Sequence, residues 1–370
     1  MLSSAVALLF LSATGVAAGA EQPEVRLLVG ENMPRTVVRA TSMVIQRWES
    51  GRWQDVLGEV RAAAFTARSH GVRLEGSDLA SSLFRVRPLS GLLQANGKYQ
   101  RGFLTISASG GSLMLVATMP LESYLVGVVN GEVDSAWPEE AVKAQVVAAR
   151  TYALHQIARQ APLYDLRTDF LHQVYAGVGA EDERAWEAVR STRGEAVYWQ
   201  GELVPAFFHS TCGGATATAS EVWGIGHPAL VSVTCEDCRD SPYYRWQSRL
   251  TVQELREAVR TLYPAAGRVR SLGIHRRTSE GRILTLFIQT DTGRILVDAG
   301  DLRKVLGYRR LPGTRFTMGL DQGDVVLTGS GYGHGVGLCQ WGARGSALKG
   351  MDYRQILGRY YPGSEVRRAF

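Results

Sequence analysis

Residues 121–158 read LESYLVGVVNGEVDSAWPEEAVKAQVVAARTYALHQIA, and this stretch predicts two helices joined by a short acidic loop. The apolar run 121–129 suits a short helix. Segment 139–158 suits a longer one, because Pro138 fits its first turn and two glutamates favour the positive end of a helix. Its small and apolar residues recur with helical spacing, and its alanines allow close packing on most sides. Two helices therefore converge on the loop Gly131-Glu132-Val133.

Strand patterns flank this helical segment. Alternating β-branched residues predict strands within 24–118, and further antiparallel strands are expected over 269–297. Shorter helices are expected over 182–190, 251–263, 298–306 and 340–348. The mixture predicts an α+β fold, with a β-rich N-terminal region over 22–100 and a core of mixed helices and antiparallel strands over 101–365.

The composition is that of a globular protein, with 45% hydrophobic and 21% charged residues among 370. A formal net charge of +6 without a basic run gives no indication of nucleic-acid binding, although it suits a polyanionic cell-wall polymer.

Residues 1–20 resemble a signal peptide, because an apolar run precedes Ala18-Gly19-Ala20 and no charged side chain interrupts it. The alternative is an uncleaved anchor helix, for which the apolar run is short. No later segment resembles a membrane span, so we expect an exported protein with no stable membrane span after signal removal.

Glu132 is the candidate acid of the loop. A carboxylate held between two apolar helices loses hydration, its pKa rises, and it can then protonate a leaving oxygen near neutral pH. The alternative is a solvated loop glutamate, and position alone does not decide between them.

Three segments of this region carry a family resemblance. They resemble the SpoIID/LytB family of peptidoglycan glycan-cleaving proteins and amidase enhancers. The segments are residues 121–132, then Trp137-Pro138-Glu139-Glu140-Ala141 with Lys143-Ala144-Gln145, and then Ala148-Ala149-Arg150-Thr151-Tyr152. The likeness extends over about residues 100–365. It includes the segments 173–177 and 209–214, but it does not extend to residues 22–100. The resemblance implies that Glu132 is the catalytic acid and that Glu122 has a structural role. Gly131-Glu132-Val133 departs mildly from the Ser-Glu-Met that the family often has at this place, but the glutamate is kept.

The resemblance implies a lytic transglycosylase, which cleaves the bond between N-acetylmuramic acid and N-acetylglucosamine without water. One residue protonates the glycosidic oxygen and then assists attack by the sugar's own 6-hydroxyl, which leaves a 1,6-anhydro-muramic end. This mechanism needs one carboxylate, whereas most glycosidases need two. The family's preference for peptide-stripped glycan extends to this chain as an expectation. Lys143 or Arg150 would contact the lactyl carboxylate of muramic acid, unless each forms a local ion pair with Glu139 or Glu140.

A group of one histidine and three cysteines has the spacing of a structural zinc site. His209-x-x-Cys212 is followed after 22 residues by Cys235-x-x-Cys238. The alternative is a disulfide, which an exported protein can form. The resemblance also implies a metal here. A closed four-ligand zinc site would be structural and would fix Ser210 near the substrate.

The segment 331–343 is dense in glycine, which lets a backbone approach a ligand closely. The resemblance places this segment in the catalytic cleft, and the alternative is a packed structural turn in which His334 bonds to backbone. Cys339 is expected to be a buried free thiol. The substrate-binding residues proposed from the sequence are His334, Gln340, Lys143, Arg150, Gln173, Tyr175 and Ser210.

Two other functions compete with the transglycosylase. One is a non-catalytic peptidoglycan-binding protein that stimulates a cell-wall amidase, which would then be a partner. The other is a zinc hydrolase, which is disfavoured because the sequence has no His-Glu-x-x-His pair. The sequence does not distinguish sporulation, division and wall turnover.

Overall fold

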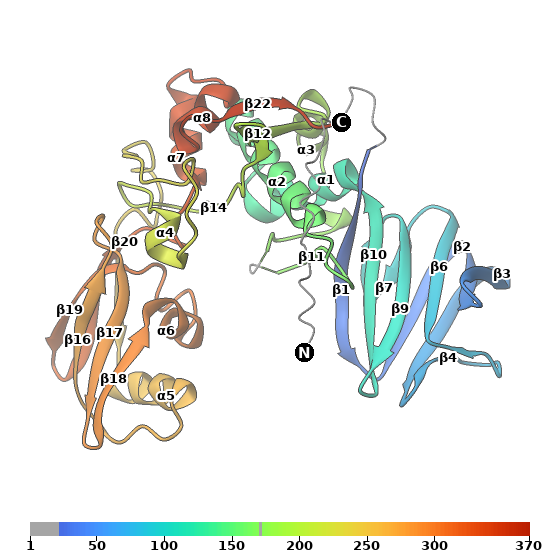
Figure 1. Cartoon of the computed structure of the whole chain (residues 1–370), viewed down its shortest axis with the longest axis horizontal. Coiled ribbons are helices and arrows are strands. Elements are labelled where there is room, and N and C mark those ends of the chain that lie inside the picture. The colour runs from blue at the N-terminus through green and yellow to red at the C-terminus, as the bar shows by residue number, and fades with distance from the viewer. Residues whose placement is uncertain (1–21, 170–171) are drawn as a thin grey trace, which may run out of the picture.

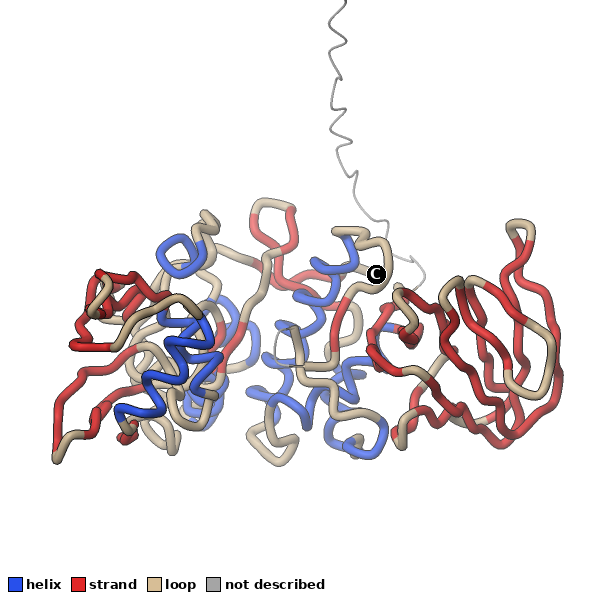
Figure 2. The backbone as a smooth tube through the Cα atoms, turned by 90° about the horizontal axis from the view of Figure 1, so that it is seen from below, coloured by secondary structure: helices blue, strands red, loops and turns tan. Residues whose placement is uncertain are grey.

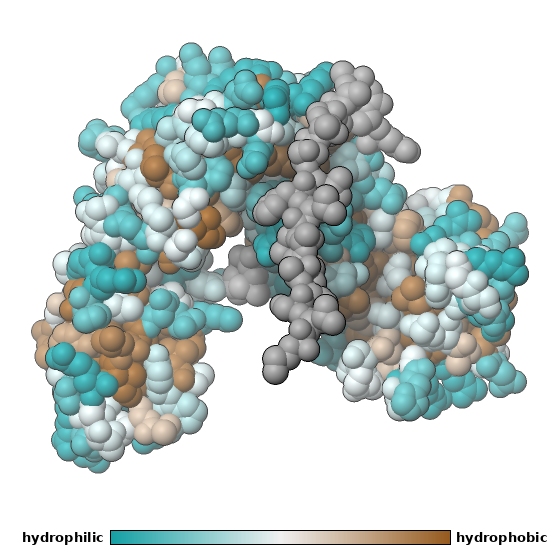
Figure 3. All heavy atoms as spheres, in the orientation of Figure 1, coloured by the Kyte–Doolittle hydropathy of each residue, from teal (hydrophilic) through white to brown (hydrophobic). Residues whose placement is uncertain are grey.

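The computed structural model describes residues 22–169 and 172–370, so the predicted signal peptide lies outside the described residues. The fold is α+β, as predicted. The chain forms an arch in which two strand-rich lobes stand on either side of a central helical region (Figure 1). Viewed from below, strands occupy the two ends and most helices lie between them (Figure 2). The space-filling view shows an open hollow between the two lobes (Figure 3).

The N-terminal lobe is one large sheet with the order β11-β1-β10-β9-β6-β2-β3-β4-β5, to which β7 and β8 are attached. It continues past residue 100, because β9 and β10 form a hairpin within it. The strands are β1 Glu24–Met33, β2 Arg35–Glu49, β3 Arg52–Arg68, β4 Gly71–Leu74, β5 Ala80–Ser81, β6 Leu83–Ser90, β7 Leu93–Ala95, β8 Lys98–Gln100, β9 Phe103–Ser109, β10 Ser112–Pro120 and β11 Leu166–Arg167.

The central region is built around α2, Glu139–Ala158, which is the long helix that the sequence predicted. One of its faces, including Val142 and Val146, packs into the core shared with the N-terminal sheet. The opposite face, including Ala144 and Val147, packs into a second core. The alanines permit this because they bring neighbouring elements close on both sides.

The other elements of the central region surround α2. They are α1 Leu121–Glu132, the 3₁₀ turn η1 Val178–Ala180, α3 Glu183–Ser191, β12 Glu195–Trp199, β13 Glu202–Leu203, β14 Phe208–His209, α4 Ala219–Trp223, β21 Leu338–Cys339, α7 Gln340–Leu348, α8 Tyr353–Tyr360 and β22 Glu365–Arg368. The parallel pair β14–β21 brings segments 130 residues apart side by side and positions the site described below.

The second strand-rich lobe, over residues 246–330, is called the third lobe because it follows the N-terminal lobe and the central region. It contains two three-stranded sheets and two helices around its own core. The capping box of Thr251 and Glu254 starts α5, and Asp298 caps α6. The elements are β15 Trp246–Leu250, α5 Val252–Leu262, β16 Val269–Arg277, β17 Ile283–Thr290, β18 Gly293–Asp298, α6 Ala299–Leu306, β19 Arg315–Asp321 and β20 Asp324–Ser330.

Among the described residues, no helix has both the length and the apolar character needed to cross a bilayer.

Candidate functional site

Glu132 is the last residue of α1, and two hydrogen bonds fix its carboxyl group. The backbone N–H of Val174 donates to Oε1 at 2.6 Å, and Nε2 of Gln340 donates to Oε2 at 3.2 Å. The first contact requires glycine at position 131, because a Cβ there would lie 2.2 Å from the carbonyl oxygen of Val174. Three segments far apart in sequence thus position one carboxyl group.

The pKa of the Glu132 carboxyl is raised from an ordinary 4.5 to about 7. Burial is the cause, and the two hydrogen bonds oppose it because they favour the charged form. The side chain is half-buried, so the carboxyl still faces open space. An acid with this pKa can both donate and accept a proton at neutral pH.

Two cavities meet at Glu132. The smaller is about 330 Å³ and the larger about 580 Å³, and both are lined by Gly131, Glu132, Ser210 and Gln340. The predicted residues Ser210 and Gln340 therefore lie at the junction. The side chain of Gln340 donates its hydrogen bond to the carboxyl group of Glu132, so its contact in this structure is with the acid.

His334 lines the larger cavity, but backbone groups engage both of its ring nitrogens. The N–H of Val336 donates to Nδ1 at 3.1 Å, so Nε2 carries the proton and faces the carbonyl oxygen of Phe208 at 2.9 Å. Burial lowers the pKa of His334 to about 3, which keeps the ring neutral. Its ring face remains for contact with a ligand, whereas its hydrogen-bonding groups are occupied.

Gln173 and Tyr175 point into the core, in contrast to the prediction that they contact substrate. Gln173 is fully buried, accepts a hydrogen bond from the hydroxyl of Tyr124 at 2.8 Å and donates to a backbone carbonyl. Tyr175 stacks on Tyr124 with ring centroids 5.5 Å apart. Burial alternates along this segment, so Gln173 and Tyr175 are buried, whereas the partly exposed His172 and Val174 line the larger cavity instead.

Neither predicted cation reaches the cavities, and for Arg150 the prediction of substrate binding was wrong. Arg150 is completely buried and forms two hydrogen bonds with Glu122, at 2.9 and 2.7 Å, so it has no surface left for a sugar. Lys143 pairs with Glu139 at 2.5 Å and Glu140 at 3.1 Å, which is the local ion pair that the sequence left open.

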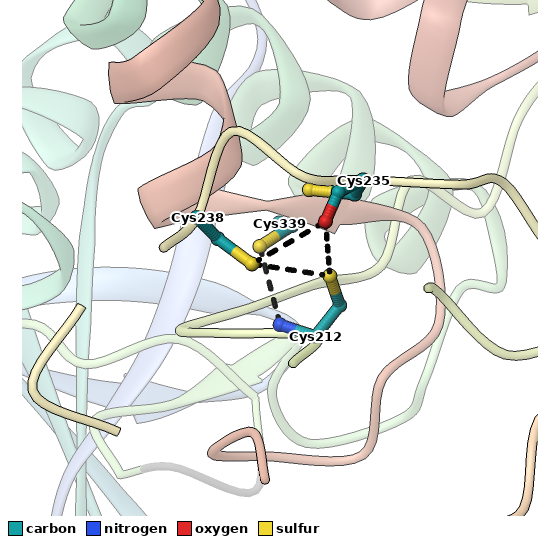
Figure 4. A group of neighbouring side chains, drawn as sticks. All are labelled: Cys212, Cys235, Cys238 and Cys339. Carbon is teal, nitrogen blue, oxygen red and sulfur yellow. Dashed lines mark hydrogen bonds between the residues drawn. The ribbon is translucent and has the colours of Figure 1, made fainter. Parts of the chain in front are cut away.

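The four cysteines form one buried group that can hold a metal ion. The sulfur atoms of Cys212, Cys235, Cys238 and Cys339 all lie within 4.8 Å of one another, and Figure 4 shows them converging. Tetrahedral zinc–thiolate bonds of about 2.3 Å would place the sulfurs about 3.8 Å apart. This set differs from the predicted one because Cys339 takes the place of His209.

His209 lies opposite Cys339 in the β14–β21 pair and outside the group of four sulfur atoms, and its Nε2 is buried without a hydrogen-bond partner in the described part of the chain. Its Nδ1 lies 3.1 Å from the carbonyl oxygen of Val336, and its ring packs against His334 with centroids 5.5 Å apart. Cys339 was missed as a ligand because it lies 101 residues after Cys238 (339 − 238), outside any paired motif. The β14–β21 pairing brings it into the group.

A buried arginine supports the fit of a metal to these thiols. Arg282 is 1% exposed, donates to the carbonyl oxygen of Cys212 at 2.9 Å, and has no ion pair with any carboxylate in residues 22–169 and 172–370. Four thiolates around a divalent cation carry a net charge of −2, which would balance part of this isolated positive charge.

Aromatic side chains dominate the remaining walls, and the sequence signalled few of them. In the smaller cavity, the rings of Trp137 and Trp341 meet edge to face, with centroids 5.1 Å apart. The larger cavity is lined by the rings of Tyr152, Phe207, Phe208, Trp223, Tyr308 and Tyr332, together with the guanidinium of Arg303. These residues come from several elements, so no local sequence motif predicts that they lie together.

Comparisons with known proteins agree with this architecture. A family described as "Stage II sporulation protein" matches residues 109–199, and a domain of unknown function matches residues 230–337. The chain is 33% identical over 273 residues to an uncharacterised protein of Brachyspira hyodysenteriae, which covers 73% of each chain.

Two relatives from Bacillus subtilis have descriptive names. Stage II sporulation protein D is 30% identical over 271 residues, 69% of this chain and 76% of that protein. The protein named "Amidase enhancer" is 27% identical over 290 residues, 65% of this chain but only 40% of that protein. The chain belongs to the stage II sporulation protein D (SpoIID) family.

Proposed function

We propose that this protein is an exported lytic transglycosylase that cleaves peptidoglycan glycan strands between N-acetylmuramic acid and N-acetylglucosamine. The observation that carries the proposal is the Glu132 carboxyl group, whose pKa burial raises to about 7 at the junction of two cavities. Family membership and the SpoIID-named relatives support the same assignment.

The cavities suit a glycan that passes over the acid. Sugar rings present apolar C–H faces that pack on aromatic rings, and aromatic residues line both sides of Glu132. A strand with its scissile bond at Glu132 would extend one sugar toward Trp137 and Trp341 and another into the larger cavity. Both volumes, about 330 and 580 Å³, lie in the range of small-molecule ligand sites.

The proposed reaction uses Glu132 twice. The protonated carboxyl donates its proton to the glycosidic oxygen as the bond to the anomeric carbon breaks. The resulting carboxylate then accepts the proton of the muramic 6-hydroxyl while that oxygen bonds to the same carbon. Val174 and Gln340 stabilise the carboxylate between these steps, because both donate hydrogen bonds to it.

A hydrolase would require a second carboxylate, and Asp134 is the candidate. It is the one other acidic residue that lines either cavity within the described part of the chain. Its Oδ1 accepts a hydrogen bond from the N–H of Ala136 in the following turn, and the side chain is exposed. This local structural role favours the single-acid mechanism.

A second candidate function rests on the relative named "Amidase enhancer". In that alternative the same groove binds glycan without cleaving it and stimulates a cell-wall amidase. A protonatable, hydrogen-bonded carboxyl group at the cavity junction has little use in such a binding protein, so we favour the enzyme.

We further propose that the four cysteines bind structural zinc. Four thiolates would saturate a tetrahedral ion and leave no position for water, so the metal would stabilise rather than react. It would hold Cys212 and Cys339, and through them the neighbouring Ser210 and Gln340, at the catalytic junction.

The test is digestion of purified peptide-free glycan strands, with the products identified by mass spectrometry. We expect 1,6-anhydro-muramic ends, which are lighter by one water than hydrolysis products, and we expect them to vanish with Glu132→Gln. The matched control is Glu183→Gln, which removes an exposed acid of α3 that lines neither cavity. Equal product from wild type and Glu132→Gln would refute the proposal, as would hydrolysed ends that depend on Asp134. Intact strands together with accelerated amidase action would establish the enhancer instead.

A further inference from the structure

Arg303 reaches the larger cavity from α6 of the third lobe, and its own backbone surroundings hold it in place. Its Nε donates to the carbonyl oxygens of Leu311 and Pro312, at 2.9 and 3.0 Å. The planar guanidinium lies over the ring of Tyr308 at 4.3 Å and near the ring of Tyr332 at 5.6 Å. The side chain is thus fixed before any ligand arrives.

Within the part of the chain that the structure describes, the charge of Arg303 has no counter-ion. No carboxylate in residues 22–169 and 172–370 forms an ion pair with it, and no acceptor in those ranges bonds its two terminal nitrogens. Burial lowers the pKa of its guanidinium, which remains charged at any physiological pH. A half-buried, unpaired guanidinium is costly unless an anion completes it.

Arg303 is also the one lysine or arginine that lines either cavity in the described part of the chain. Lys143 and Arg150, the cations first expected to meet an anionic sugar, are paired with glutamates elsewhere. Any carboxylate entering the larger cavity therefore has a single cationic partner.

We propose that Arg303 binds the lactyl carboxylate of a muramic acid unit in the larger cavity and thereby selects glycan whose stem peptide has been removed. The inference rests on the proposed function and adds its specificity-determining residue. When a peptide is attached, the lactyl group is an amide without charge, and it leaves the guanidinium unpaired. When the peptide is removed, the free carboxylate accepts two charge-assisted hydrogen bonds from the fork of the guanidinium.

The experiment measures binding in the Glu132→Gln background, in which the ligand is not consumed. The two probes are peptide-free muramic-acid-containing oligosaccharides and the same oligosaccharides with their carboxylates converted to methylamides. Titration calorimetry should show the carboxylate form bound about tenfold more tightly, because a hydrogen bond to a charged group contributes about that factor. Adding Arg303→Gln should bring the ratio close to one.

Two further variants separate recognition from folding. Lys304→Gln removes the neighbouring exposed cation of α6 and should leave the ratio unchanged. Arg303→Lys retains a positive charge and should keep part of the preference. Equal weakening of both probes by Arg303→Gln, or an unchanged ratio, would overturn the proposal even if wild type still releases anhydro-muramic ends. If neither probe binds and no ends form, the proposed function itself fails.

Discussion

Replacing Glu132 with glutamine should stabilise the protein at alkaline pH while abolishing its proposed activity. The folded-state pKa of this carboxyl is raised from 4.5 to about 7. The folded protein therefore holds the proton more tightly than the unfolded chain does. The stabilisation that the protonated Glu132 carboxyl contributes to the folded state is fully present below pH 4.5 and is lost as pH rises through about 7.

The magnitude follows from the size of the pKa shift. A shift from 4.5 to about 7 corresponds to about 3 kcal/mol of destabilisation once the carboxyl is ionised in both states. Glutamine avoids that cost, but its single amide oxygen can accept from only one of the two donors, Val174 and Gln340. The lost hydrogen bond costs about 1 kcal/mol. We therefore expect Glu132→Gln to leave the free energy of unfolding nearly unchanged at pH 5 and to raise it by about 2 kcal/mol at pH 8.

Urea unfolding of wild type and Glu132→Gln at pH 5 and pH 8 measures this effect. Other titrating groups are common to both proteins, so they cancel in the difference between their free energies of unfolding. That difference should change by about 2.5 kcal/mol between the two pH values. The control Glu183→Gln removes an exposed, ion-paired acid of α3, and an equal change there would show that the effect is not specific to Glu132. A difference for Glu132→Gln that does not vary with pH would show that the carboxyl is solvated and would refute the reasoning.

Three further predictions concern the pKa of Glu132, the metal ligands and the buried ion pair of Arg150 with Glu122. The value of kcat/KM should fall as pH rises through about 7. In Gln340→Ala this fall should occur about one pH unit higher, because the hydrogen bond that is lost lowers the pKa of Glu132 in the wild type. A fall at the same pH in both proteins would exclude this role of Gln340. Cys339→Ser should abolish bound metal measured by elemental analysis, whereas His209→Gln should retain it, and the reverse pattern would restore the ligand set predicted from sequence. Arg150→Met should lower the free energy of unfolding by about 3–5 kcal/mol, because it leaves a buried carboxylate unpaired, and a change below about 1 kcal/mol would contradict that.

Local sequence patterns were sufficient to predict most of the helices and to propose the acid, although α4 and α8 were not predicted. The expected helix over 139–158 matches α2 at both ends, because its start signals and its small-residue pattern are local properties. Glu132 could be proposed because a family motif marks it and because the convergence of two helices predicts desolvation. The glycine-rich segment also singled out Gln340, which lines both cavities and bonds to Glu132, while its contact with substrate stays a prediction.

Side-chain direction was the main source of error. Gln173 and Tyr175 belong to a segment that reaches the site, yet they face the core while His172 and Val174 face the cavity. Because burial alternates from residue to residue here, a shift of one residue exchanges the buried and the cavity-lining side chains, and nothing in the local sequence decides which set is buried.

The sequence by itself determined the α+β class, the long central helix, the family and the identity of the catalytic candidate, because each depends on residues close together in the chain. Only the tertiary structure decided which cysteine completes the thiol group and which cation faces the ligand. Cys339 and Arg303 reach the site through strand pairing and the placement of a separate lobe. Their roles depend on how separate segments of the chain are brought together, and spacing along the chain carries no record of that arrangement.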